Sequence, residues 1–163
     1  MVKLIKLFDN NNEEILFNIP DYISKLFPLD NFSSFGFLMD GEYFQTSEHA
    51  FQYLKFKDTN RQIANEIKKA KSPDDARKIA HENKEYKLNN WSEVKYINMK
   101  KVLMLKVEEN PLVKEALLQT KDYKICEFCV DEDTDWGIDS NNNGSNHLGN
   151  IWMEIRSSLR GDE

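Results

Sequence analysis

The sequence predicts a helix-rich α+β fold, a single domain over residues 1–163 with a small antiparallel β component. Three observations carry this prediction. Residues 46–119 contain successive segments with helix-capping residues and helical spacing of apolar side chains. Short alternating segments joined by turn residues precede them and indicate hairpins. The length of 163 residues is typical of one domain, and 40% hydrophobic residues suffice for a core.

The β component is expected mainly before the helices. Residues 1–9 alternate charged and apolar side chains and predict a first strand. The three asparagines at 10–12 suit a hairpin turn, because asparagine tolerates left-handed backbone. Asp40–Gly41 separates residues 35–39 from 42–44 and predicts a second hairpin. Residues 124–130 predict a further short strand.

The helices are predicted from residues that typically begin or end a helix. Thr46 and Ser47 supply N-cap hydroxyls for a helix to about Phe56, and residues 61–70 form the next. Ser72–Pro73, followed by two acids, starts a third. Residues 91–109 predict a long helix, and a run of apolar residues is expected on its buried side: Val94, Ile97, Val102, Met104 and Leu105. Asn110–Pro111 ends it and starts another helix, and residues 148–159 predict a closing helix.

Composition excludes several classes of protein. The 22 Lys+Arg against 28 Asp+Glu give a net charge of −6, which argues against binding long nucleic acid through phosphate neutralisation. No apolar stretch reaches the roughly 18 residues that span a bilayer, so no membrane partner is expected. The first residues lack the apolar core of a signal peptide. Two cysteines in such a chain favour a reducing compartment, and we expect a cytoplasmic protein with free thiols.

One helical stripe carries a carboxylate, an amide and an amine. Glu48, Gln52 and Lys55 fall on the same side of the helix that starts near Thr46. Aromatic and apolar residues flank this stripe on both sides. The stripe is either a solvated face, with the lysine pairing with the glutamate, or part of a site.

The late segment 131–137 is the second candidate. It ends in Trp136–Gly137, which pairs a flat ring with a residue that permits close backbone approach. Asp133 lies just before this pair. The segment is either a pocket floor or a solvated acidic loop with a core tryptophan, and the Asn-rich residues 139–146 that follow predict a surface loop at or near a site.

A metal site is not expected. Cys126 and Cys129 form a CxxC pair, but on a strand they would point to opposite faces, and no second ligand pair exists. The three histidines, His49, His81 and His147, show no ligand spacing. Motifs for dinucleotides, P-loop phosphates, elbow serines and zincins are absent, and we expect no cofactor.

An ordered set of motifs resembles the YbiA-like family, also called the NADAR domain family. Its main element is similar to Asp40–Phe56, with Ser47-Glu48-His49 and Phe51-Gln52 at the centre. The element at Phe32–Phe35 precedes it. Later elements keep the family's order, and their positions are Ser72-Pro73, Trp91–Lys95, Met99–Lys106, Asn110-Pro111, Asp133 with Trp136-Gly137, Gly144–Gly149 and Met153–Arg156.

The chain departs from the family pattern at several positions. Ser34 replaces an asparagine, and Lys121 and Asp139 each replace a glycine. His147 and His81 stand where relatives carry arginine. Because histidine binds phosphate less firmly than a guanidinium does, the phosphate contacts are the part of the resemblance that these changes affect.

The resemblance implies the YbiA-like fold and an N-glycosidase, a hydrolase of N-glycosyl bonds. Relatives cleave ribosylamino pyrimidine intermediates of riboflavin biosynthesis, and others remove ADP-ribose from guanine bases. The implied catalytic residues are Glu48, Asp133 and Lys55. The implied substrate-binding residues are Trp91, Trp136, Gly137, Gln52, Asn146 and Phe35.

The expected partner is therefore a small nucleotide-like molecule, most simply a ribosylamino pyrimidine phosphate. The alternatives are an ADP-ribosyl glycohydrolase acting on an ADP-ribosylated nucleobase, and a non-catalytic module that binds ADP-ribose or a nucleotide. All three readings require the Glu48 helix and the Asp133 loop to meet around one sugar. The sequence leaves the oligomeric state open.

Overall fold

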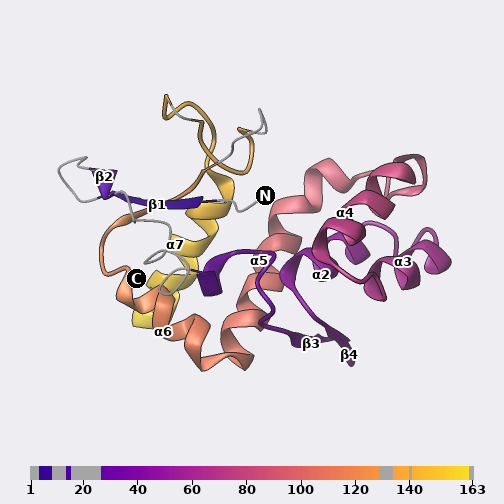
Figure 1. Cartoon of the computed structure of the whole chain (residues 1–163), viewed down its shortest axis with the longest axis horizontal. Helices are drawn as coiled ribbons and strands as arrows, with labels where there is room; N and C mark the ends of the chain where they lie inside the picture. Colours follow the sequence, from indigo (N-terminus) through magenta and orange to yellow (C-terminus); the bar gives the residue numbers. More distant parts are fainter. Residues whose placement is uncertain (1–3, 9–13, 16–26, 129–133, 140, 162–163) are drawn as a thin grey trace. The chain divides into compact units, whose positions relative to one another are not determined.

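The computed structural model describes residues 4–8, 14–15, 27–128, 134–139 and 141–161 (Figure 1). The chain groups into two compact units, one of residues 31–111 and one of residues 1–30 with 112–163. Within the described residues, six α-helices and a few short antiparallel strands confirm the helix-rich α+β class. None of these helices is long and apolar enough to cross a bilayer. A single domain over residues 1–163 stays a prediction.

The unit of residues 31–111 is helical with one hairpin. Its elements are β3 (Phe37–Met39), β4 (Glu42–Phe44), α2 (Ser47–Leu54), α3 (Arg61–Lys68), α4 (Pro73–Glu82), the 3-10 turn η2 (Lys84–Tyr86) and α5 (Trp91–Glu109). Helix α2 packs against α3, α4 and α5, and β3 packs against α5. All eight residues of α2 are consequently buried.

The β3–β4 hairpin confirms the predicted turn. Asp40 and Gly41 have φ angles of 53° and 81°, the left-handed pair that a two-residue type I′ turn requires. Phe37 and Phe44 face each other across the strands and are fully buried. Leu38 points to the other side and is 51% exposed. Because successive side chains of a strand point to opposite faces, one face of the hairpin lies in the core and the other is exposed.

The predicted helix starts are confirmed by their caps. The hydroxyl oxygen Oγ1 of Thr46 accepts a hydrogen bond from the backbone N–H of His49 at 3.3 Å. Ser72 does the same for the N–H of Asp75 at 3.0 Å, with Pro73 as the first helical residue. Helix α2 ends at Leu54, slightly before the predicted end.

The predicted buried side of α5 is wrong in part. The helix spans the predicted residues, but Ile97 is 69% exposed and Met104 39% exposed. Its buried side instead runs through Met99, Leu103 and Lys106. Apolar residues occur all around this helix, so their spacing does not single out one face, and a lysine occupies a core position.

The second unit combines a three-stranded antiparallel sheet with two helices. Its elements are β1 (Leu4–Phe8), β2 (Glu14–Ile15), the 3-10 turn η1 (Phe27–Leu29), α6 (Pro111–Gln119), β5 (Lys124–Phe128) and α7 (His147–Arg160). The strand order is β2-β1-β5. The antiparallel β1–β2 pair confirms the first predicted hairpin, whose turn at residues 10–12 lies outside the described residues. Helix α7 packs on β5.

Candidate functional site

Glu48 and Gln52 form a buried polar pair on α2. Glu48 is 7% exposed and Gln52 is 5% exposed, so the solvated-face interpretation is wrong for both. The amide Nε2 of Gln52 donates to Oε1 of Glu48 at 2.7 Å. The backbone N–H of Glu48 donates to the carbonyl of Asn31 at 3.1 Å. These contacts fix the carboxylate at the start of α2, where the helix dipole favours negative charge.

The amide of Gln52 has one engaged end and one open end. Its Oε1 atom is buried and accepts no hydrogen bond from the described residues. Buried polar atoms are satisfied in the great majority of protein structures, so an unmet acceptor beside a carboxylate points to a ligand donor.

Lys55 lies against two aromatic rings. Its Nζ atom is 5.4 Å from the ring centroid of Phe51 and 5.6 Å from that of Trp91. The two rings contact each other, with centroids 5.0 Å apart at 58°. Trp91 is 6% exposed, so its ring packs against the ammonium group and does not present a broad face to solvent. Such ring contacts stabilise a cation.

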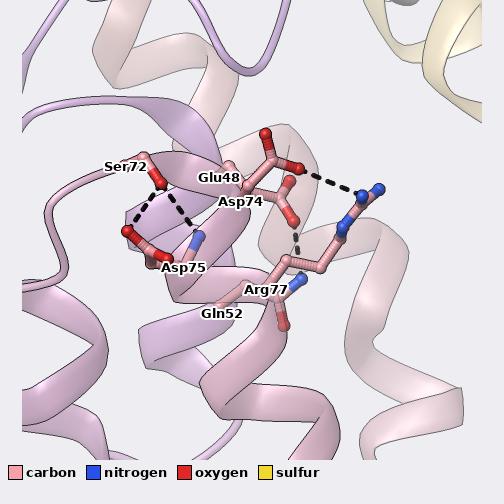
Figure 2. A network of polar contacts seen from close by, with 6 residues as sticks. All are labelled: Glu48, Gln52, Ser72, Asp74, Asp75 and Arg77. Carbon is pink, nitrogen blue, oxygen red and sulfur yellow. Dashed lines mark hydrogen bonds and ion pairs between the residues drawn. The ribbon is translucent and has the colours of Figure 1, made fainter. Parts of the chain in front are cut away.

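Helix α4 adds charged groups near this pair, as Figure 2 shows. Asp74 and Arg77 of α4 are joined by a 3.2 Å ion pair, and they lie on the side of α2 that carries Glu48 and Gln52 (Figure 2). The guanidinium of Arg77 is also 5.5 Å from the ring centroid of Phe32. Arg77 was not identified from the sequence, because an exposed arginine paired within its own helix carries no motif.

His49 is a structural neighbour of the site. Its Nδ1 lies 2.8 Å from the hydroxyl of Thr46, and its Nε2 lies 3.2 Å from the carbonyl oxygen of Ala70. Since a carbonyl only accepts, Nε2 carries the proton and Nδ1 accepts from the hydroxyl. Burial lowers the pKa of His49, and the Ala70 carbonyl opposes this only in part. A neutral histidine thus ties the start of α2 to the segment before α4.

Phe35 belongs to a different contact in the same unit. Its ring centroid lies 5.9 Å from Nζ of Lys106, a fully buried amine that donates to the hydroxyl of Ser33 at 2.9 Å. The lysine was not identified as functional from the sequence, although its helix lies inside the resembling region. Its role here is to anchor the segment that contains Phe35.

The late loop of the other unit is closely packed. The carbonyl of Trp136 accepts from the N–H of Leu148 at 3.0 Å, and that of Gly137 accepts from the N–H of Asn146 at 3.2 Å. Gly144, with φ of 144°, lies so near the Gly137 carbonyl that a Cβ atom there would overlap it. Trp136 is half-buried. Asp133, the predicted second carboxylate, lies outside the described residues.

Asn146 binds the edge of β5 with both ends of its amide. Its Oδ1 accepts from the N–H of Glu127 at 3.0 Å, and its Nδ2 donates to the carbonyl of Ile125 at 2.9 Å. The residue is 4% exposed and left-handed, with φ of 50°. These contacts give Asn146 a holding role, and its predicted contact with substrate stays a prediction.

The two histidines at family arginine positions differ in setting. His147 begins α7, and its Nε2 lies 3.7 Å from a carboxylate oxygen of Asp135. His81 is exposed near the end of α4, one turn after Arg77.

The second unit also has a polar cavity beside this loop. Its volume is about 380 Å³, which is in the range of small-molecule sites. It is lined by Lys124, Ile138, Asn142, Gly144, Ser145, Asn146 and Asn150. In the part of the chain that the structure describes, no group of three His, Cys, Asp or Glu side chains is arranged to hold a metal ion. Cys126 is buried, and Cys129 lies outside that part.

The structure thus assembles two groups of predicted site residues. Glu48, Gln52, Lys55 and Trp91 lie together around α2, and Phe35 belongs to the same unit, where its ring contacts Lys106. Trp136, Gly137 and Asn146 lie in the loop before α7. The meeting of the two groups around one sugar stays a prediction.

Comparison with known proteins places the chain in a family. A model of the NADAR domain matches residues 17–160. The chain belongs to the NADAR domain family. The predicted resemblance is therefore confirmed. The matched span includes both groups of site residues, so the Glu48 pair and the loop before α7 are parts of one NADAR domain match.

Several named relatives resemble this NADAR domain chain over most of its length. N-glycosidase YbiA of Escherichia coli (strain K12) is 33% identical over 129 residues, which cover 79% of each chain. An N-glycosidase of Nostoc punctiforme is 30% identical over 131 residues, covering 80% of this chain and 83% of the relative. The NMR structure of E. coli YbiA matches with a TM-score of 0.74 at 31% identity, covering 83% of this chain and 79% of that one.

Proposed function

We propose that this protein hydrolyses the C–N bond between ribose and the amine of ribosylamino pyrimidine phosphates, the class of intermediate found in riboflavin biosynthesis. The observation that carries the proposal is the buried Glu48 carboxylate, which Gln52 holds by a hydrogen bond. Lys55 follows Gln52 by about one helical turn, and its amine lies against an aromatic ring. A buried carboxylate and a half-buried cation on the same helix suit the cleavage of a polar bond to a sugar.

The chain is an N-glycosidase, in keeping with its family and with its named relatives. The pyrimidine substrate is the finer part of the proposal. It is supported by two further relatives named as riboflavin biosynthesis proteins, from Vibrio vulnificus and Zea mays, at 26% and 31% identity. The match covers 35% and 21% of those longer proteins, so their names apply to more than this region.

The reaction breaks one bond and consumes one water. As the C–N bond lengthens, positive charge builds on the ribose ring, and the amine leaves after taking up a proton. Glu48 stabilises the charge at the anomeric carbon, and Asp133 takes a proton from the water whose hydroxyl adds to C1. That proton balances the one that the leaving amine takes up. Two carboxylates flanking the bond are the usual arrangement for this chemistry.

Lys55 has two possible roles, and its surroundings favour one of them. The ring contacts with Phe51 and Trp91 stabilise its ammonium form. An ammonium group holds sugar or phosphate oxygens, whereas an amine nucleophile must first lose its proton. We therefore assign Lys55 to substrate holding, with Trp91 packed against its ammonium group, and we assign Trp136 to the heterocycle. The expected setting is the cytoplasm.

Product release tests the proposal. The protein is incubated with a ribosylamino pyrimidine phosphate and, separately, with ADP-ribosyl guanosine, and the released base and sugar phosphate are measured by liquid chromatography with mass detection. Glu48→Gln should lower kcat/KM by about a hundredfold or more. Glu66→Gln is the matched control, because Glu66 is an exposed carboxylate on α3 that also accepts from a glutamine one turn away.

The outcomes separate the candidate functions. Turnover of the pyrimidine substrate that Glu48→Gln abolishes and Glu66→Gln preserves supports the proposal. If the protein releases base from ADP-ribosyl guanosine alone, that compound class replaces the ribosylamino pyrimidine as the proposed substrate. Binding of either compound without release by the unmodified protein makes the chain a non-catalytic module, and equal activity of Glu48→Gln removes Glu48 from its role.

A further inference from the structure

We infer that Gln52 recognises the 2-hydroxyl of the substrate's ribose, so that the site takes ribosides in preference to 2-deoxyribosides. This rests on the proposed function, because it names the sugar that the same site accepts. The inference begins from the one buried amide on α2 that is satisfied at one end and unsatisfied at the other.

The orientation of the Gln52 amide is fixed by its neighbour. A carboxylate is an acceptor only, so the end of the amide that faces the Glu48 carboxylate at 2.7 Å must be the NH₂ group. Turning the amide over would bring two acceptor oxygens together. The end left for a ligand is therefore the carbonyl oxygen Oε1, which accepts hydrogen bonds and cannot donate them.

The open acceptor selects the kind of ligand group. Oε1 is buried and lacks a donor among the described residues, and such an atom costs folding free energy when it stays unmet. A hydroxyl or amine of the ligand removes this cost. A phosphate oxygen or a carbonyl brings another acceptor and is repelled.

Asn31, on a neighbouring segment, also has a buried side-chain acceptor that lacks a donor among the described residues. Its carbonyl accepts from the N–H of Glu48, and its side-chain Oδ1 is buried with no partner in the described part of the chain. Its Nδ2 faces the sulfur of Met99 at 3.7 Å. The surroundings of Glu48 thus hold two unmet acceptors, which suits the hydroxyls of a sugar.

The position of Gln52 relative to Glu48 identifies which hydroxyl it meets. In the proposed reaction Glu48 acts at the anomeric carbon C1. Gln52 lies one helical turn away, with side chains at this spacing about 5–6 Å apart at Cβ, and it is bonded directly to the Glu48 carboxylate. The atom next to C1 that carries a donor is C2. A hydrogen bond to this hydroxyl also strengthens as charge develops on the ring.

The test compares paired substrates that differ only at C2. The ribosyl and 2-deoxyribosyl forms of one N-glycoside are assayed with the wild type, with Gln52→Met and with Gln52→Asn, which keeps an amide but withdraws it by one methylene. Loss of the bond to Glu48 affects both substrates equally. Only the ratio of the two kcat/KM values reports the 2-hydroxyl, and it also cancels the different intrinsic reactivities of the two sugars.

We expect the ratio of ribosyl to 2-deoxyribosyl activity to fall about tenfold in Gln52→Met. The control is Gln62→Met on α3, where an exposed glutamine donates to Glu66 at 3.2 Å in a similar pair. That variant should leave the ratio unchanged. A ratio that is the same in wild type, Gln52→Met and Gln52→Asn overturns the inference while leaving the N-glycosidase activity established.

Failure of the proposed function gives a different result. If the wild type releases no base from either form, binding of ribose 5-phosphate and 2-deoxyribose 5-phosphate is measured by titration calorimetry. Tighter binding of the ribose compound that Gln52→Met abolishes supports the role of Gln52 without catalysis. Equal binding of the two sugars, or binding of neither, overturns it. Thermal unfolding of each variant confirms that it is folded.

Discussion

Asn146 offers a sharp test of structure against sequence pattern, because the resemblance implies a substrate contact and the geometry shows a bond to β5. Strand β5 pairs with β1 along one edge. On its other edge, the N–H of Glu127 meets the Asn146 side chain and the Glu127 carbonyl accepts from the N–H of Ile138 at 2.8 Å. Asn146 therefore takes the place of a neighbouring strand at an edge that must be covered.

The perturbation is Asn146→Ala. It leaves the buried N–H of Glu127 without an acceptor and removes one donor from the carbonyl of Ile125. An unmet buried N–H costs roughly 1–3 kcal/mol, and a second lost bond about 1 kcal/mol, so the free energy of unfolding should fall by about 2–4 kcal/mol. For a chain of this length that corresponds to a fall of the unfolding midpoint by roughly 4–16 °C.

The assay is thermal and urea unfolding followed by circular dichroism, with Asn150→Ala as the control. Asn150 is an exposed residue of α7 whose amide donates to the carbonyl of Ser145 at 3.2 Å, and its loss should shift the midpoint little. Asn146→Ala with an unchanged midpoint and weakened substrate binding would refute the holding role and restore the direct contact that the resemblance implies.

Two other predictions concern stability. The pKa of His49 is lower in the folded protein than its usual 6.5, mainly through burial, so its contribution is present above about pH 6.5 and is lost as the pH falls below that value through the folded pKa. Urea unfolding at pH 7.5 and pH 5 should therefore show a loss of stability that His49→Gln reduces, and an equal loss in both proteins would contradict this assignment. Gly149 lies so close to the carbonyl of Ile125 that an added Cβ would overlap it. Gly149→Ala should lower the free energy of unfolding by roughly 1–3 kcal/mol through this overlap. Gly161 has open space around it but a φ of 73°, so Gly161→Ala should lower it by about 1–2 kcal/mol through backbone strain alone. Chemical denaturation measures both changes, and an unchanged stability of Gly149→Ala would contradict the overlap.

The local features of the fold were predictable from the sequence. Thr46 and Ser72 are followed by helices because their hydroxyls meet backbone N–H groups, and this depends only on near neighbours. The Asp40–Gly41 turn is equally local. The buried side of α5 was not predictable, because the lysine at 106 lies in the core through a distant bond to Ser33.

The site was predictable as a set of residues and less so in its environment. Spacing places Glu48 and Gln52 on one stripe, but whether a stripe is solvated depends on α3, α4 and α5, which surround it only in the folded unit. The bonds of Asn146 to a strand about twenty residues away leave no local signal, so its holding role was not predictable from the sequence. Arg77 likewise gained its position from the packing of α4 on α2.

The brevity of α2 has a consequence for how this enzyme can vary. A helix of eight residues does not persist alone in water, so its shape is imposed by the helices around it. Those helices hold α2 in place, and the buried side chains of Ile67 on α3 and Ala76 on α4 belong to that apolar packing. A change of side-chain volume in these surrounding helices is therefore expected to shift the Glu48 carboxylate and alter the reaction rate with every polar residue unchanged.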